Sequence, residues 1–287
     1  LDWPGRLPEV HRGLMRIEVI LVRPESSFFG RLAAAFRRIA SSLDTSVQVH
    51  VTFMNESDTK AIAARITDRS IRRSGLVISS PDTPDVRDAL ERVRANGLPV
   101  VQVVTRVIDD AHFVGIDNYA AGRMAGMMVA RLGAVQGPVV ALCHSQVYSV
   151  HRDRLRGFSD YLAEHPHGTD FVHVQFGGDD LDQTSERLYR VLQQWPDVAA
   201  VYNAGGANEA VIEMLKRKGR KLFFVGHELD DRAAAALKDG TVDVILDQLP
   251  EAQARRSLDI LLSEIGILPD PVVNPPMRFT TITRENV

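Results

Sequence analysis

The sequence contains one cysteine, Cys143, among 287 residues. A lone cysteine cannot close a disulfide within the chain, and it cannot build the thiolate clusters that hold structural zinc. Because Cys143 ends an apolar segment, we expect a small buried residue there rather than a catalytic thiol. Disulfide-stapled and thiolate zinc proteins are thereby excluded.

Long hydrophobic runs are also absent. No apolar stretch approaches the ~18 residues that a helix needs to cross a bilayer. The opening LDWPGRLPEVHRGLMR is polar and lacks the apolar core of a signal peptide. A net charge of −3 gives this chain no general electrostatic reason to hold nucleic acid. We therefore expect a cytoplasmic protein with no membrane partner.

The motifs of common enzymes are missing as well. The sequence has no GxGxxG, no GxxxxGK[ST] phosphate loop and no GxSxG nucleophile elbow. The nine histidines are scattered, and no two stand at metal-ligand spacing on one expected helix. No nucleophile is paired with a base. We expect no catalytic residue, no metal and no cofactor, and an enzyme is the weakest of three functional hypotheses.

What the sequence does have is an alternation of short apolar and longer amphipathic segments, over a length that fits two domains. Expected strands in the first half span residues 17–22, 47–53, 75–80, 99–104 and 112–116, with helices such as 28–43 and 85–97 between the earlier ones. The second half repeats the pattern, with strands at 138–143, 170–176, 198–203, 221–227 and 242–247, and helices near 150–164, 181–195, 206–218 and 229–238. A further amphipathic helix is expected at 249–266. The alternation predicts two doubly wound α/β units with parallel sheets.

The segment VGHELDD, residues 225–231, admits two interpretations. His227 and Glu228 match the first half of the zinc motif HExxH, but Asp231 stands where the second histidine belongs. Alternatively, the segment ends a buried strand and delivers Glu228 into a ligand site. The zinc interpretation leaves one imidazole without a second ligand, so we favour the strand.

Ligands of parallel sheets bind beyond the carboxyl ends of the strands. Asn203 directly ends an expected strand, and it is a better candidate contact than Asn208, which follows on the next helix. Arg154 lies near a helix start, and its planar fork of donors suits two adjacent hydroxyls of a polyol. Of Phe28 and Phe29, one is expected in the core, and the other can stack on the apolar face of a sugar ring.

Together these features resemble the type I periplasmic-binding fold and, more narrowly, the effector domain of lactose-repressor-type (LacI family) transcription regulators. The resemblance runs from about Met15 to Val287. It is carried by "SSFFGRLAAAF", "PVVQVVTR", "VGIDNYAAGRMAGMMVARLG", "RLRGFSDYL", "AAVYNAGGANEAVIEMLKRKG", "LFFVGHELDD", "ILDQLPEAQARRSLDILL" and "TTITREN". The fourth is similar to the family's R-x-x-G-F signature, and the third to its D-N-x-x-(A/G)-G helix.

The resemblance implies a fold, a domain layout and a site. It implies two Rossmann-like lobes joined by a multi-strand hinge: residues 15–133 with 249–268, and 134–248 with 269–287, after a residual linker at 1–14. Each lobe would supply half of a sugar site at the hinge. The implied contacts are Phe28, Phe29, Ser80, Arg106, Asp117, Arg154, Asn203, Glu228 and Gln248. Carboxylates would accept from sugar hydroxyls, and Arg and Gln would donate to them.

The sequence departs from the family pattern at three places. Glu228 stands where an Asp is usual, and Thr105 where sugar-binding relatives often have Asp before Arg. "NAGGANE" replaces N-D-x-x-A and is one residue shorter. These differences bear on the identity of the sugar or polyol more than on its class.

The resemblance also implies a role. A regulator would be a homodimer that reaches operator DNA only through a helix-turn-helix domain upstream of this chain, and "LDWPG" resembles the L-G-Y-x-P that ends that domain in the family. Ligand binding would change DNA affinity. The alternative is an exported solute-binding receptor of a sugar ABC transporter, which has the same fold.

Overall fold

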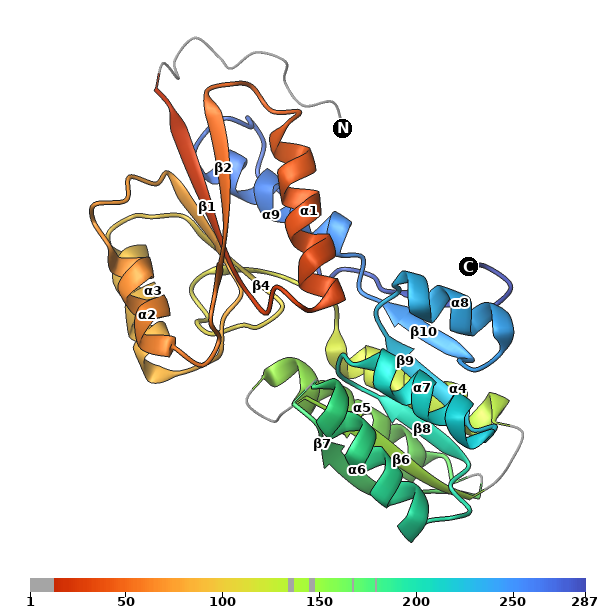
Figure 1. The fold of residues 1–287 in the computed structure, drawn as a ribbon. Coiled ribbons are helices and arrows are strands. Elements are labelled where there is room, and N and C mark those ends of the chain that lie inside the picture. The colour runs from red at the N-terminus through yellow and green to blue at the C-terminus, as the bar shows by residue number, and fades with distance from the viewer. Residues whose placement is uncertain (1–12, 134–136, 145–147, 167, 179) are drawn as a thin grey trace. The chain divides into compact units, whose positions relative to one another are not determined.

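The computed structural model describes residues 13–133, 137–144, 148–166, 168–178 and 180–287. The chain divides into two compact units (Figure 1). Unit 1 comprises the described residues up to Gly115 together with Leu249–Met277, and unit 2 comprises Ile116–Gln248 together with Arg278–Val287. The chain therefore crosses between the units three times. No helix in the described ranges is both long enough and apolar enough to span a bilayer.

Unit 1 is a five-stranded parallel sheet in the order β2-β1-β3-β4-β5. Its strands are β1 (Met15–Val22), β2 (Val47–Met54), β3 (Gly75–Ile78), β4 (Val100–Val103) and β5 (His112–Val114). Its helices are α1 (Ser27–Ala40), α2 (Thr59–Thr67), α3 (Pro84–Ala95) and α9 (Pro250–Glu264). Helix α1 packs beside α9 and α2 packs beside α3, with the two pairs on opposite faces of the sheet (Figure 1).

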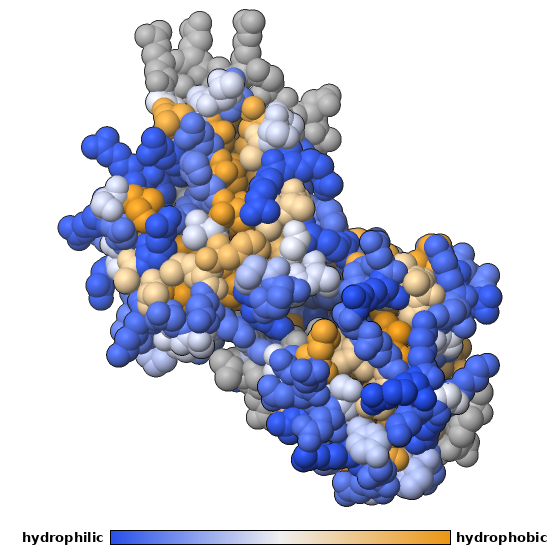
Figure 2. Space-filling view, viewed as in Figure 1, coloured by the Kyte–Doolittle hydropathy of each residue, from blue (hydrophilic) through white to orange (hydrophobic). Residues whose placement is uncertain are grey.

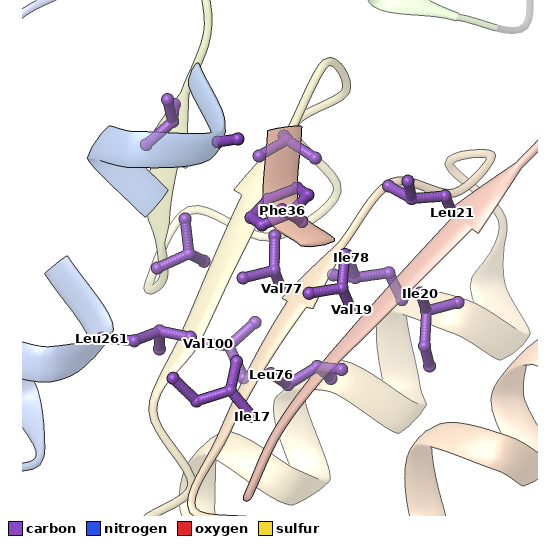
Figure 3. Packing of buried hydrophobic residues seen from close by; sticks show 14 of the residues in the cluster. Ile17, Val19, Ile20, Leu21, Phe36, Leu76, Val77, Ile78, Val100 and Leu261 are labelled. Carbon is purple, nitrogen blue, oxygen red and sulfur yellow. The ribbon is translucent and has the colours of Figure 1, made fainter. Parts of the chain in front are cut away.

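The core of unit 1 follows from strands that are apolar on both faces, as a sheet covered on both sides requires. Ile17, Val19, Leu76 and Val77 are almost fully buried, and Figure 3 shows them packed with Phe36 of α1 and Leu261 of α9. In β1, five of the six residues from Ile17 to Val22 are hydrophobic. The exception lies at Glu18.

Glu18 is a buried carboxylate within the apolar segment Ile17–Val22 of β1. Arg65 and Arg73 neutralise it, at 2.7 and 2.9 Å. Arg73 also donates to the carbonyl oxygens of Arg65 and Ile66 at the end of α2. Because burying an unpaired charge is costly, the two guanidiniums account for how this carboxylate is tolerated.

The edge strand β2 is less well covered than the central strands. Its Val49, Val51 and Phe53 are only partly buried against the core. Figure 2 shows a hydrophobic stripe over this part of unit 1, among mostly hydrophilic side chains. Such exposure is typical of an edge position, where one side of the strand has no neighbour.

Unit 2 is a six-stranded sheet in the order β11-β10-β9-β8-β6-β7, parallel except for the antiparallel β10–β11 pair. Its strands are β6 (Gly137–Cys143), β7 (Thr169–Phe176), β8 (Ala200–Asn203), β9 (Phe223–His227), β10 (Val244–Asp247) and β11 (Thr280–Ile282). Its helices are α4 (Asn118–Leu132), α5 (Ser149–Glu164), α6 (Leu181–Gln194), α7 (Asn208–Lys218) and α8 (Asp231–Asp239).

Helices α4 and α5 are in backbone contact through glycines. A Cβ at Gly122 would lie 2.0 Å from the carbonyl oxygen of Arg154, and a Cβ at Gly157 would lie 2.1 Å from that of Tyr119. At Gly126 it would meet Tyr161 at 3.0 Å. The glycines of "NYAAGRMAG" and "RLRGF" are therefore required by this close approach.

The division of the chain differs from the lobes expected from the sequence. The sequence places residues up to 133 in the first lobe, but α4 packs on α5 and belongs to unit 2. The sequence also assigns residues 269–277 to the second lobe. In the structure Asn274 donates to the carbonyl oxygen of Phe113, and Met277 to that of Gly115, which keeps this tail with unit 1.

The predicted fold class is confirmed: the protein is α/β, with two sheets whose strands are mainly parallel. Every expected strand is present, displaced by at most a few residues at its ends. The residual linker predicted at 1–14 falls almost wholly outside the described residues.

Candidate functional site

The order of the strands locates the candidate site in each unit. In unit 2 the chain passes from β6 outward to β7 and then returns to β8 on the other side of β6. In unit 1 it passes from β1 outward to β2 and returns to β3. Ligands of doubly wound sheets bind at the carboxyl ends of the strands where this direction reverses. Those positions are β6/β8 in unit 2 and β1/β3 in unit 1.

Arg154 occupies the β6/β8 position of unit 2. Its side chain is 2% exposed. Nε donates to Asn118 Oδ1 at 2.9 Å, and Nη1 donates to the carbonyl oxygen of Ala204, just after β8, at 2.8 Å. The glycine contacts between α4 and α5 bring Asn118 within reach, so the two family-like motifs together orient one guanidinium. This arrangement holds the planar fork of donors rigidly.

Two asparagines brace the loop between β8 and α7. Asn203 Nδ2 donates to the carbonyl oxygen of Gly206 and, at 2.8 Å, to Asn208 Oδ1. Asn208 Nδ2 donates to the carbonyl oxygen of His227 at the end of β9. Both amides are buried. The structure thus places Asn203 at the predicted strand end, where its amide nitrogen holds the loop.

Glu228 follows β9 directly, as the strand interpretation of VGHELDD expects. Its backbone has φ +68°, a left-handed conformation uncommon for a non-glycine residue. Gln248, just beyond β10, donates from Nε2 to Glu228 Oε1. Both side chains are more than nine-tenths buried. The predicted pair Glu228 and Gln248 is therefore brought together in one hydrogen bond.

His227 is fully buried, and its Nε2 lies 2.9 Å from the hydroxyl of Tyr202. Burial holds the pKa of His227 well below its usual value, and the positive charge of Arg154 and the neighbouring His151 act in the same direction. Burial likewise raises the pKa of the Tyr202 phenol. Both side chains are neutral near pH 7. In the described ranges, no three His, Cys, Asp or Glu side chains gather where they could hold a metal ion.

Asp117 and Arg106 have other contacts in the structure. Asp117 is exposed and caps α4, accepting from the backbone N–H of Ala120 at 2.8 Å. Arg106 is exposed and its guanidinium lies 5.1 Å from the ring centroid of Phe113. An N-cap role explains the aspartate of the D-N motif without a ligand.

The remaining predicted residues lie in unit 1. Ser80 is 1% exposed and follows β3. Phe28 and Phe29 pack edge to face, with centroids 5.3 Å apart, and both are buried in the core of unit 1. Both rings therefore lie in the core of unit 1, and the stacking of one of them on a sugar stays a prediction.

Sequence reasoning did not single out an aromatic group in unit 2. His144, Tyr148 and His151 lie at the end of β6 and the start of α5, with ring centroids 5.5 to 5.9 Å apart. All three are at least nine-tenths buried. His144 directly follows an apolar strand, and that position was the signal that could have found it.

Comparison with known proteins places this architecture in a family. Residues 17–266 match the family model described as the periplasmic binding protein domain. The ribose import binding protein RbsB of Salmonella typhimurium is 21% identical over 251 residues, which cover 85% of this chain and 82% of that protein.

Solved structures show the same fold. An ABC transporter solute-binding protein of Burkholderia graminis in complex with D-arabinose superposes with a TM-score of 0.86 at 19% identity, over 96% of this chain and 97% of that one. A putative LacI transcriptional regulator of Bacteroides fragilis gives a TM-score of 0.82 at 19% identity, over 95% and 98% of the two chains. Since the family model spans most of the sequence, the chain belongs to the periplasmic binding protein domain family.

Proposed function

We propose that the protein binds a monosaccharide or a polyol through polar residues at the carboxyl ends of its strands. The observation that carries the proposal is the buried guanidinium of Arg154, held by Asn118 and the Ala204 carbonyl at the β6/β8 position. A fixed, planar set of donors at the end of a parallel sheet is suited to adjacent hydroxyl oxygens.

The neighbouring groups provide the complementary chemistry. Glu228 and Gln248 lie together at the ends of β9 and β10, where a carboxylate accepts from hydroxyls and an amide both donates and accepts. Asn203 adds a buried amide at the end of β8. Hydroxyl-rich ligands need such paired donors and acceptors, because an unmade hydrogen bond in a buried site is costly. These are binding groups, and we propose no reaction for them.

We propose that the protein serves as the solute-binding receptor of a sugar transporter. This role is supported by its likeness to the ribose import binding protein and to the D-arabinose-bound solute-binding protein described above. A further similar structure, from Actinobacillus succinogenes, holds D-allose, with a TM-score of 0.86. A receptor of this kind would be exported and would deliver its ligand to a membrane partner.

The second candidate is the effector domain of a LacI-type regulator. It is favoured by the order of family-like motifs along the sequence and by the likeness to the Bacteroides fragilis regulator. In that role the protein would be cytoplasmic and homodimeric, and it would act on operator DNA through an upstream helix-turn-helix. "LDWPG", which motivated this reading, lies outside the described residues.

The binding proposal is tested by thermal unfolding against D-ribose, D-arabinose, D-allose, D-tagatose, sugar phosphates and polyols. A ligand at 100 times its Kd adds about 2.7 kcal/mol to the stability of the folded state and raises the unfolding temperature. The absence of a shift with every compound would count against a carbohydrate ligand.

Arg154→Met tests the central residue. The substitution keeps an apolar stem and removes the donors, so we expect the ligand-induced shift to disappear. Arg152→Met on the same helix is the control, since Arg152 is exposed. Equal ligand affinity in the two variants would remove Arg154 from the site.

The native N-terminus of the endogenous protein distinguishes the two roles. It is determined from the intact mass of the protein and from the upstream coding sequence. A basic helix-turn-helix segment before Leu1 supports the regulator. A cleaved apolar leader supports the transport receptor.

A further inference from the structure

Unit 1 has a groove of about 410 Å³ at the edge of its sheet where β3 and β4 begin. The groove is lined by the last residues of α2 and α3, which lie side by side (Figure 1), and by the chain that leads from each helix into the next strand. Ligands of doubly wound sheets bind at the opposite edge, beyond the carboxyl ends of the strands. The sugar-binding proposal therefore makes no use of this groove.

The groove carries an excess of positive charge. Its charged lining side chains are Asp68, Arg69, Arg73 and Arg92. Glu18 and Arg65 extend the cluster, since Glu18 pairs with both Arg65 and Arg73. Together these four arginines exceed the two carboxylates by two, so the groove favours an anion with two negative charges.

Two of the guanidiniums are open to a ligand. Arg69 and Arg92 are exposed, and neither side chain forms an ion pair or a hydrogen bond with the residues that the structure describes. A single exposed arginine without a partner is ordinary. Two that share one groove with a buried third supply the planar forks of donors that suit phosphate and carboxylate groups.

Arg73 is the buried member of this set. Its side chain is 5% exposed, and its two terminal nitrogens donate to the carbonyl oxygens of Ile66 and Arg65. Nε is screened from solvent and has no partner among the described residues. Burial lowers the pKa of this guanidinium, because the carboxylate of Glu18 only partly offsets the loss of water. An acceptor brought by a ligand would satisfy a donor that is costly to leave unpaired.

The rest of the lining suits an anion with an organic part. Carbonyl groups at a helix C-terminus disfavour anions, but those of Arg65 and Ile66 already accept from Arg73. The carbonyl oxygen of Arg92 at the end of α3 likewise accepts from the side chain of Asn96. Apolar side chains complete the groove, and these are Ile66, Ile71, Val93 and Leu98. Such a surface favours a ligand with an apolar body beside its charged group.

We propose that this groove binds a phosphate monoester whose organic part is apolar. The phosphate is bound by Arg69, Arg73 and Arg92, and the organic part lies on the apolar side chains. A phosphate monoester carries a charge of about −1.5 to −2 near pH 7, which matches the excess of positive charge. Arginine also binds phosphate through two parallel N–H donors. The inference is independent of the sugar-binding proposal, because neither the groove nor its test involves a sugar.

Calorimetric titration with phenyl phosphate at fixed ionic strength tests the inference. The groove binds both parts of the ligand, so phenyl phosphate should bind more tightly than inorganic phosphate, and phenol should show no binding. Arg69→Gln and Arg92→Gln each remove one charge at an exposed position, so the fold should persist. The Kd for phenyl phosphate should rise about fivefold or more in each variant, since each loses a hydrogen bond between charged groups.

Arg72→Gln is the matched control. Arg72 is exposed in the same segment but does not line the groove, so this variant loses the same charge and should keep the wild-type Kd within about twofold. The inference is overturned if phenyl phosphate does not bind the wild-type protein, or if Arg69→Gln and Arg92→Gln bind it as tightly as Arg72→Gln does. Equal affinity for inorganic phosphate and phenyl phosphate would overturn the assignment to an ester. None of these outcomes bears on the sugar-binding proposal.

Discussion

Replacing Gly157 by alanine tests how the helices α4 and α5 hold Arg154 in place. The added Cβ would lie 2.1 Å from the carbonyl oxygen of Tyr119 and 3.0 Å from the backbone nitrogen of Arg123. Both are backbone atoms, so no side-chain rotation can relieve the contact. The helices must move apart by roughly 1 Å to reach an ordinary van der Waals separation.

The expected change in the free energy of unfolding for Gly157→Ala is the difference between two effects. Alanine is favoured over glycine in a helix interior by about 1 kcal/mol. Overpacking a tight contact typically costs ~1–3 kcal/mol, and more where backbone must shift. For a contact this short we expect the upper end of that range, so Gly157→Ala should destabilise unit 2 by about 2 kcal/mol.

Gly30→Ala provides the control within the same chain. Gly30 lies inside α1, and nothing is found within 4 Å of a Cβ built there. That substitution should therefore stabilise unit 1 by about 0.5–1 kcal/mol.

Urea unfolding followed by circular dichroism measures both variants, and carbohydrate binding is measured in parallel. Because α4 carries Asn118 and α5 carries Arg154, moving these helices apart should also weaken ligand binding. If Gly157→Ala raised the free energy of unfolding as much as Gly30→Ala does, the inference that Gly157 is needed for close contact between α4 and α5 would be wrong.

Two further predictions concern buried polar groups. Gln102 of β4 is fully buried, and its side chain accepts from the backbone N–H groups of Val107 and Ile108 and donates to the carbonyl oxygen of Ile108. Gln102→Met leaves these backbone groups without their partner, so it should cost about 2–5 kcal/mol of unfolding free energy in a denaturant titration. A loss below about 1 kcal/mol would contradict the role of Gln102 in holding the segment after β4. His227 has a pKa well below 6.5 in the folded protein because of burial and the charge of Arg154, so the unfolded chain binds a proton there first as pH falls. Stability should therefore be full above about pH 6.5 and decline below it, by up to about 1.4 kcal/mol per pH unit. In His227→Gln this decline should be reduced, and identical slopes between pH 6.5 and 5 in the variant and the wild type would show that another group is responsible.

The fold could be read from the sequence because its signals are local. The segments 17–22 and 75–80 are apolar at nearly every position, which indicates strands buried on both faces, and amphipathic helices separate them. The strand end at His227 and Glu228 followed from the same alternation. The placement of Arg154 after β6 was also visible, since it needed only the order of the elements.

The boundary between the units was misplaced for a physical reason. The sequence of the segment 116–133 contains no local signal for the helix against which it packs. Its glycines are compatible with any close approach, and only the folded chain shows that they meet α5. Likewise, the spacing of Asn274 and Met277 from β5 is a long-range property that no periodicity reveals.

The sequence by itself determined the secondary structure, the parallel sheets and the edge of each sheet at which polar residues collect, because hydrophobic periodicity and strand order act over short distances. The tertiary structure alone decided which polar groups are bonded within the protein and which are not. Asp117 caps a helix and Asn203 holds a loop, whereas the hydroxyls of Ser79, Ser80 and Thr105 remain without partners. Hydrogen bonding depends on distances of a few tenths of an ångström between residues far apart in the chain, and those distances exist only after packing.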